Sequence, residues 1–327
     1  MNKKNKRVSL FIYPTYRCLG NCVFCFINPE LRKKSNDLTL NEIKKNINYF
    51  KKKYLINDLA LLGGEPFLYE DFIPLMNFLS DNYLFNSKVR NLIIATEALK
   101  CSSVIFTNYL ANFFNFNPNS RSCFHISLNN FCKEDRFFNQ RKIAILNLAK
   151  KKFPVRFILL FTKDNLEAIK NGADFLATIF SKYYLNLAPY SYNFIIELRL
   201  PFNPNDNKSE LFVPDPDRFL ETFHSISNLF FEKQIPLALR NIPLCYLEIK
   251  NLENFNEMYF IKTDVTKTII RIDKKNQLGQ AKISSYSNEN WSLQKECSLC
   301  FFKNKCNGVS SIYIKKFKYP LLRPFIK

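Results

Sequence analysis

Three cysteines near the amino terminus have a spacing suited to an iron–sulfur or metal site. Cys18, Cys22 and Cys25 lie in TYRCLGNCVFCF, as Cys-x3-Cys-x2-Cys, directly after an apolar run. Thiolates this close can converge on one centre only where the backbone loops around it, and Gly20 supplies that freedom. Three ligands rather than four leave a position open for a substrate or cofactor, as in catalytic sites.

The same thiols could instead bind zinc, with Cys123 or His125 as a distant fourth ligand. The spacing, with the aromatic Phe24 before the last cysteine, resembles the hallmark of the radical S-adenosylmethionine (radical SAM) superfamily. The resemblance implies that the three cysteines hold a [4Fe–4S] cluster whose fourth iron chelates SAM. One electron would then cleave SAM to methionine and a 5′-deoxyadenosyl radical, which abstracts hydrogen from a substrate.

A second motif, Gly63–Gly64–Glu65–Pro66, ends the second expected strand. The cationic amino group of SAM needs carbonyls and a carboxylate nearby, and glycine allows the backbone to approach closely. The chain has only six glycines, so two adjacent ones here favour function over a chance turn. The resemblance implies that these four residues bind SAM.

Weaker similarities follow at later strand ends. The segment 106–108 (FTN) resembles the family's third-strand end. Ser127 and Asn129, in HISLNN, resemble its fourth-strand end and could bond the ribose hydroxyls of SAM, or simply cap a loop. Arg199 could meet the SAM carboxylate, or pair with Glu197. No residue is assigned as catalytic.

A second thiol array lies near the carboxyl terminus. Cys297, Cys300 and Cys306 form a Cys-x2-Cys-x5-Cys array, and Cys245 is available as a fourth thiol. Zinc would suit such an array, and Cys245 could be an ordinary buried cysteine. The array resembles the SPASM and twitch extensions of radical SAM enzymes, which implies one auxiliary Fe–S cluster with these four ligands. A full SPASM domain uses more cysteines, so a twitch is the nearer match.

The remaining sequence predicts elements that would position these residues. β-rich runs alternate with helical periodicity, which is typical of a parallel sheet wrapped by helices. Strands are expected at residues 8–13, 58–62, 104–107, 123–128, 155–161, 194–200 and 266–273. Helices are expected behind a Thr39–Glu42 capping box and at 72–84, 87–100, 133–151, 165–184 and 215–233, with a turn at 274–279. Six β/α units predict a partial (β/α)6 TIM-type barrel over residues 1–234 and a Cys-rich extension over 235–327.

Composition limits the class of protein. Hydrophobic residues make up 47% of the 327, enough for a sizeable core. The net charge of +20 favours anionic partners, although the lysines are spread along the chain, as AT-rich coding would produce. No apolar run is long enough to cross a membrane, and the stretch after MNKKNKR is too short for a signal peptide. Clustered thiols in such a chain predict metal ligands in the cytoplasm rather than disulfides.

Three functions compete at this stage. The first is a radical SAM enzyme that modifies a peptide or protein, as maturases of ribosomally made peptides do, with an electron donor such as flavodoxin or ferredoxin. The second keeps this chemistry but acts on RNA or a small metabolite such as a nucleotide, because of the charge. The third is a basic nucleic-acid-binding module with two zinc sites.

Overall fold

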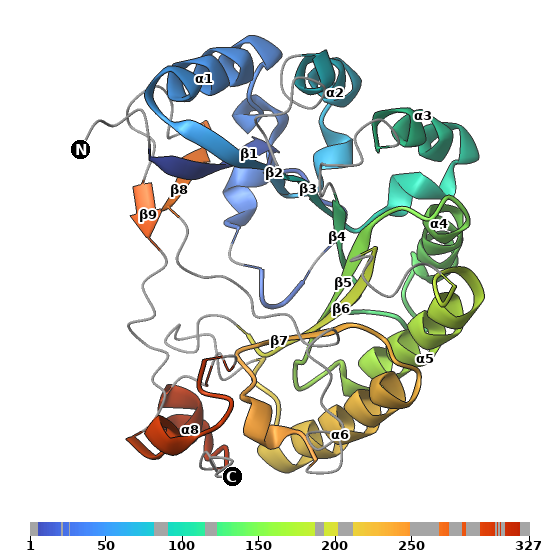
Figure 1. The fold of residues 1–327 in the computed structure, drawn as a ribbon. Coiled ribbons are helices and arrows are strands. Elements are labelled where there is room, and N and C mark those ends of the chain that lie inside the picture. The colour runs from blue at the N-terminus through green and yellow to red at the C-terminus, as the bar shows by residue number, and fades with distance from the viewer. Residues whose placement is uncertain are drawn as a thin grey trace. The chain divides into compact units, whose positions relative to one another are not determined.

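The computed structural model describes thirteen stretches of the chain (Figure 1). They are residues 6–20, 22–25, 27–81, 91–114, 123–186, 193–201, 212–248, 268–274, 283–285, 295–304, 306, 308 and 311–320. The chain divides into two compact units. Unit 1 comprises Met1–Ile126, Gln140–Val155 and Thr266–Tyr286, and unit 2 comprises Ser127–Asn139, Arg156–Val265 and Ser287–Lys327.

Strands and helices alternate along most of the described chain. The strands are β1 (Arg7–Thr15), β2 (Leu55–Gly63), β3 (Asn91–Thr96), β4 (Cys123–Ser127), β5 (Val155–Leu160), β6 (Phe194–Arg199), β7 (Leu237–Arg240), β8 (Thr268–Ile272) and β9 (Ile283–Ser285). The helices are α1 (Leu40–Lys53), α2 (Phe72–Leu79), α3 (Val104–Phe114), α4 (Phe138–Lys150), α5 (Leu166–Tyr183), α6 (Pro216–Glu232) and α8 (Ser311–Phe317). Of these helices, none has the length and hydropathy needed to cross a bilayer.

The strands form one sheet in the order β7-β6-β5-β4-β3-β2-β1-β8-β9. The pairs β1–β2, β2–β3, β3–β4, β6–β7 and β1–β8 are parallel, and β9 runs antiparallel to β8. Within the described residues the sheet has two ends, β7 and β9, so it is not closed into a full barrel. This confirms the expected fold class of a partial β/α barrel.

Local sequence explains the first β/α unit. The middle of β2 is buried on both faces, as expected for a parallel strand covered on both sides. Helix α1 buries Ile43, Ile47 and Phe50 on one stripe. The expected capping box is confirmed, because Thr39 and Glu42 each accept a hydrogen bond from the other's backbone N–H.

The expected third strand at residues 104–107 is wrong, and so is the expected helix at 87–100. Residues 104–107 begin α3, whereas the strand is β3, Asn91–Thr96. Val104 and Ile105 have the β-branched side chains typical of strands, but they lie on the solvent side of the first helical turn, 58% and 84% exposed. The segment 106–108 therefore lies within a helix. The strand end that it was expected to mark is at Thr96.

Over the described residues, the other expected strands and helices are confirmed, with ends shifted by a few residues. Residues 82–84, 87–90 and 266–267 of the expected elements lie outside the described residues. The strand expected at 266–273 is β8, and it pairs with β1. Of the turn expected at 274–279, Lys274 is a turn residue and the remainder lies outside the described residues. Strands β7 and β8 lie beyond residue 235 and belong to the same sheet as β1–β6. The division of the chain near residue 235 stays a prediction.

Candidate functional site

The two adjacent glycines fix the backbone that leads into the first cysteine loop. Gly64 N donates to Thr15 O at 3.0 Å, and Glu65 N donates to Arg17 O at 2.7 Å. A Cβ atom on Gly64 would lie 2.0 Å from Arg17 O. Gly63 has φ +120°, and its Cβ would lie 2.3 Å from Thr15 O. The close approach that requires glycine is thus made to the segment directly before Cys18.

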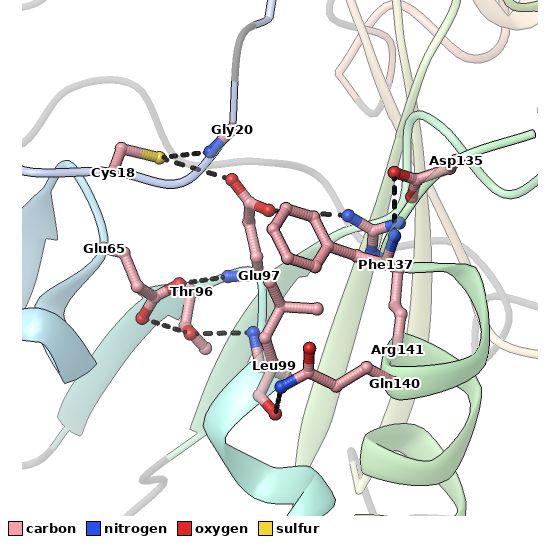
Figure 2. Close-up of polar contacts among 11 residues, drawn as sticks. Cys18, Gly20, Glu65, Thr96, Glu97, Leu99, Asp135, Phe137, Gln140 and Arg141 are labelled. Carbon is pink, nitrogen blue, oxygen red and sulfur yellow. Dashed lines mark hydrogen bonds and ion pairs between the residues drawn. The ribbon is translucent and has the colours of Figure 1, made fainter.

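The Glu65 side chain joins the ends of β2 and β3 (Figure 2). Its Oε1 accepts hydrogen bonds from Phe67 N at 3.1 Å and Thr96 Oγ1 at 2.6 Å, and its Oε2 accepts one from Glu97 N at 2.7 Å. Burial raises the pKa of this carboxyl to about 7, although all three donors favour the charged form. Glu65 therefore links the end of β2 to the end of β3. Its contact with SAM stays a prediction. The contact of Pro66, the first residue of the following 3-10 turn, with SAM also stays a prediction.

Glu65→Ala should destabilise unit 1, because it leaves the buried N–H groups of Phe67 and Glu97 without their acceptor. We expect the free energy of unfolding to fall by about 2–4 kcal/mol. The folded pKa of about 7 lies above the ordinary value near 4.3. The stability that Glu65 contributes is therefore complete below the ordinary value and is lost as the pH rises through about 7.

The loss in Glu65→Ala should consequently be larger at about pH 6 than at about pH 8. Thermal unfolding of anaerobically purified protein at both values measures it. Glu70→Ala is the matched control, because Glu70 is exposed and forms a surface ion pair with Lys34. Equal unfolding midpoints for the two variants would contradict the role given to Glu65.

The described part of the cysteine loop has features that suit thiolate ligands. Gly20 N donates to Cys18 Sγ at 3.3 Å, and Cys25 N donates to Cys22 O at 3.0 Å, which closes a turn that contains the half-buried Phe24. Amide donors of this kind stabilise charge on a ligating sulfur. Burial, with the charge of Glu97 second, raises the pKa of Cys18 to about 12 and of Cys22 to about 11. Binding of a metal centre would therefore displace protons.

The arrangement of these thiols does not define a site for a single ion. No group of three or more His, Cys, Asp or Glu side chains among the described residues is placed to hold one metal ion. A cubane differs in this respect, because each thiolate binds a different iron at a different corner. Three loop thiols with an amide donor on one sulfur fit a cluster. Their assignment as its ligands stays a prediction.

Glu97 is a site residue that the sequence analysis missed. It directly follows β3, accepts a hydrogen bond from the Cys18 thiol at 3.3 Å, and pairs with Arg141 of α4 at 3.4 Å (Figure 2). A Cβ on Gly20 would lie 2.2 Å from Glu97 Oε1, so this glycine makes room for the carboxylate. The signal was an acid directly after the strand-like run LIIAT. The helix expected at 87–100 contains Glu97, so the sequence does not place this residue at a strand end, whereas β3 ends at Thr96.

Unit 2 contains the two residues expected at the end of β4. Asn129 Oδ1 accepts a hydrogen bond from Leu160 N at 2.9 Å, and Asn129 O accepts one from Asn165 Nδ2 at 3.1 Å. These bonds join the ends of β4 and β5, which matches the loop-capping alternative. Ser127, the last residue of β4, is half-buried. Contacts of Ser127 and Asn129 with ribose stay predictions.

Arg199 forms the pair with Glu197 that the sequence raised as an alternative. Its Nε donates to Glu197 Oε1 at 2.8 Å and its Nη2 donates to the same oxygen. Arg156 Nη1 lies 3.4 Å from Glu197 Oε2. Burial alone would raise the pKa of Glu197, but the charges of Arg199, Arg156 and Arg240 lower it to about 2. A contact of Arg199 with the SAM carboxylate stays a prediction.

In the carboxyl-terminal array, Cys306 receives two backbone donors. Leu244 N and Gly308 N donate to its Sγ at 3.4 Å and 3.3 Å. Leu244 directly precedes Cys245. Its hydrogen bond to Cys306 therefore places the backbone before Cys245 beside this array. The Gly308 bond repeats the geometry at the first array, where Gly20 N donates to the cysteine two residues before it.

The other two cysteines of this array lie near Cys306. Cys300 N donates to Cys297 O at 3.1 Å, and Cys297 is buried. Burial raises the pKa of Cys306, and the charges of Cys297 and Cys300 raise it further. Thiolates are the usual ligands of Fe–S clusters, so the chemistry of these residues suits an auxiliary cluster. The assignment of all four, Cys245 included, stays a prediction.

Comparisons with known proteins agree with these features. The model of the radical SAM superfamily matches residues 12–176, about half of the chain. An S-adenosylmethionine-dependent nucleotide dehydratase from Selenomonas ruminantium is 35% identical over 75 residues, which are 23% of this chain and 26% of that protein. The similarity thus spans about a quarter of that relative.

Two solved structures share the fold. Streptococcus suis SuiB bound to precursor peptide SuiA has a TM-score of 0.58 and 15% identity, covering 96% of this chain and 74% of that one. Native anSMEcpe with bound AdoMet and Cp18Cys peptide has a TM-score of 0.55 and 15% identity, covering 93% and 89%. At these identities the likeness concerns the fold alone.

Proposed function

This chain belongs to the radical SAM superfamily and is an enzyme that uses SAM, and from that membership we propose that Cys18, Cys22 and Cys25 hold its [4Fe–4S] cluster. When bound, the cluster supplies an electron and SAM supplies the 5′-deoxyadenosyl radical that takes a hydrogen atom from the substrate. The observation that carries the proposal is the backbone packing of Gly64 and Glu65 against residues 15–17. The zinc-binding nucleic-acid module does not fit this membership.

The chain's own residues have separate tasks in this proposal. The glycine pair holds the start of the cysteine loop, and Gly20 N donates to the Cys18 sulfur. Glu97, paired with Arg141, places a negative charge beside the loop. Iron and sulfide quantification with EPR, followed by an assay for 5′-deoxyadenosine, tests the proposal. A colourless protein that contains zinc and forms no 5′-deoxyadenosine would contradict it.

We propose that Cys245, Cys297, Cys300 and Cys306 hold one auxiliary Fe–S cluster, as in a twitch extension. The donors from Leu244 and Gly308 to Cys306, and the proximity of Cys297 and Cys300, support it. We further propose that the protein is cytoplasmic, where thiols stay reduced. Its electron donor is proposed to be of the flavodoxin or ferredoxin class.

Replacing Cys297 or Cys300 with alanine should stop product formation and spare uncoupled SAM cleavage, because the first cluster keeps its three ligands. The expected result is wild-type formation of 5′-deoxyadenosine and an iron content about half of the wild-type value. Iron analysis and chromatography of the nucleoside products measure both. If these variants form no 5′-deoxyadenosine, the two arrays do not have separate tasks.

For the substrate, we propose first a peptide or protein. SuiB and anSMEcpe, which share the fold, were solved with peptides bound, and this analogy supports the proposal. Mass spectrometry tests it: the enzyme is incubated under reducing conditions with a short precursor peptide encoded beside its gene. A change in peptide mass that depends on SAM supports this substrate class, and no change despite active SAM cleavage contradicts it.

A second candidate substrate is a nucleotide or RNA. The relative that is similar over 75 residues is a nucleotide dehydratase, and the net charge of +20 favours anionic molecules. Binding to RNA should weaken steeply as salt rises. If the protein shows no salt-sensitive retention of RNA near physiological ionic strength, RNA is excluded as the substrate. A small nucleotide then remains as the candidate.

A further inference from the structure

An ion pair at the end of β8 is bonded to the segment that enters the first cysteine loop. Arg271 Nε donates to Asp273 Oδ2 at 2.7 Å, and Asp273 is 2% exposed. The Tyr16 hydroxyl donates to the same carboxylate oxygen at 2.8 Å and accepts a hydrogen bond from Arg271 Nη2 at 2.9 Å. All three residues belong to unit 1. Tyr16 is thus held by Asp273 across 257 positions of the chain.

This ion pair lies on the same side of the sheet as the aromatic residues of β1. Arg271 is beside Phe11 in the parallel register of β1 and β8 (Figure 1). Residues two apart along a strand share a face, so Tyr13 lies on this side as well. The guanidinium of Arg271 is 4.3 Å from the centroid of the Tyr13 ring, and the rings of Tyr13 and Tyr16 are 5.8 Å apart. The ion pair and the two tyrosines therefore form one connected group.

Tyr16 contacts the parts of unit 1 that hold both ends of the first cysteine array. It lies two residues before Cys18, and its carbonyl oxygen is so close to Gly64 that a Cβ atom there would be 2.5 Å away. The buried hydrophobic cluster that contains Tyr16 also packs against Cys25. A displacement of Tyr16 would therefore move Cys18 and Cys25 relative to each other.

The hydrogen bonds around Asp273 should hold Tyr16 in one position. Tyr16 is 3% exposed, so its bond to the carboxylate is made inside the core. A hydrogen bond to a charged acceptor is stronger than one between neutral groups. A buried donor or acceptor that loses its partner costs more than the bond itself contributes. The side chain of Tyr16 is thus fixed by the residues at the end of β8.

We propose that Arg271 and Asp273 are positioning residues of the first cysteine array. They act through Tyr16: its side chain is bonded to them, its backbone leads into Cys18, and its hydrophobic cluster packs against Cys25. The inference rests on the proposed function, in which this array holds the cluster that binds SAM. Residues that support a reactive centre determine its geometry to within a fraction of an ångström, and a small misplacement can have a large effect.

Tyr16→Phe tests the inference, because it removes the hydroxyl and keeps the ring. The full-length, anaerobically purified protein is used. We expect hydrogen–deuterium exchange of the backbone at residues 16–20 to be about tenfold faster than in the wild type. The SAM concentration that gives half-maximal formation of 5′-deoxyadenosine should rise about tenfold, with little change in the maximal rate. Asp273→Asn keeps an acceptor oxygen but loses the charge, and should show smaller changes in the same direction.

Tyr313→Phe is the matched control. Tyr313 is a buried tyrosine of unit 2, and its hydroxyl donates to Pro201 O at 2.8 Å. This variant also loses one buried hydroxyl, so its unfolding midpoint should fall as that of Tyr16→Phe does. Exchange at residues 16–20 and the half-maximal SAM concentration should stay at their wild-type values.

The outcomes separate this inference from the proposed function. Wild-type exchange and a wild-type half-maximal SAM concentration in Tyr16→Phe overturn it. Equal changes in Tyr16→Phe and Tyr313→Phe also overturn it, because they reflect a general loss of stability. If Tyr16→Phe does not fold, Asp273→Asn decides by the same measurements. If the wild type forms no 5′-deoxyadenosine, the proposed function fails, and exchange at residues 16–20 still decides whether the end of β8 positions the loop.

Discussion

Gly64→Ala should abolish cluster binding and SAM cleavage. The new Cβ would lie 2.0 Å from Arg17 O and 2.5 Å from Tyr16 O, and backbone atoms cannot move aside as the end of a side chain can. The segment before Cys18 must shift, which breaks the bonds from Gly64 N and Glu65 N. We expect a loss of about 3–5 kcal/mol in the free energy of unfolding. Iron content, 5′-deoxyadenosine and the unfolding midpoint measure the effect.

Gly172→Ala is the matched control for this prediction. Gly172 lies inside α5, and its added Cβ would be 3.3 Å from Leu128 Cδ2, the end of a flexible side chain. Alanine gains about 1 kcal/mol over glycine within a helix, which offsets the tight contact. The control should keep iron and activity. If Gly64→Ala also keeps both, the glycine pair does not position the cysteine loop.

Replacing any one of Cys18, Cys22 and Cys25 with alanine should reduce SAM cleavage below detection. Three thiolates hold three of the four irons and leave the fourth free for SAM. Removing any one of these thiolates therefore removes the site-differentiated cluster. The protein should lose about four irons per chain if the auxiliary cluster is retained. Anaerobic iron analysis, EPR of the reduced protein and the 5′-deoxyadenosine assay measure this.

Cys132→Ala is the control for the cysteine variants. Cys132 belongs to neither array and is only half-buried, so its loss should change neither iron content nor SAM cleavage. A Cys22→Ala protein with full iron content and wild-type 5′-deoxyadenosine formation would contradict the assignment of the first array.

The sequence could predict those parts of the site that depend on residues close together in the chain. The first cysteine array lies within eight residues, and Gly63–Pro66 within four, so their spacing reports directly on a loop and a turn. The order of β/α units was also predictable, because buried parallel strands and amphipathic helices have different periods. β3 was missed because the β-branched Val104 and Ile105 resemble a strand, although they occupy exposed helix positions.

Contacts between distant residues were not predictable. Arg156 of β5 pairs with Glu197 of β6 across 41 positions. Glu97 approaches Cys18 across 79 positions. No local pattern marks such pairs, because each depends on strand register and on which face a side chain takes. The sequence suggested that Arg199 could pair with Glu197 because those two are neighbours on one strand face.

The parallel pairing of β8 with β1 bears on how this enzyme can be shortened. β8 covers the backbone of β1 from Ser9 to Ile12, just before the strand runs into the cysteine loop. Removing the chain from residue 268 onward would leave a row of unsatisfied amide and carbonyl groups along a long apolar edge, a surface that invites pairing between molecules and aggregation. An attempt to isolate a minimal catalytic domain therefore has to retain a strand that lies far along the sequence from the cysteines it supports.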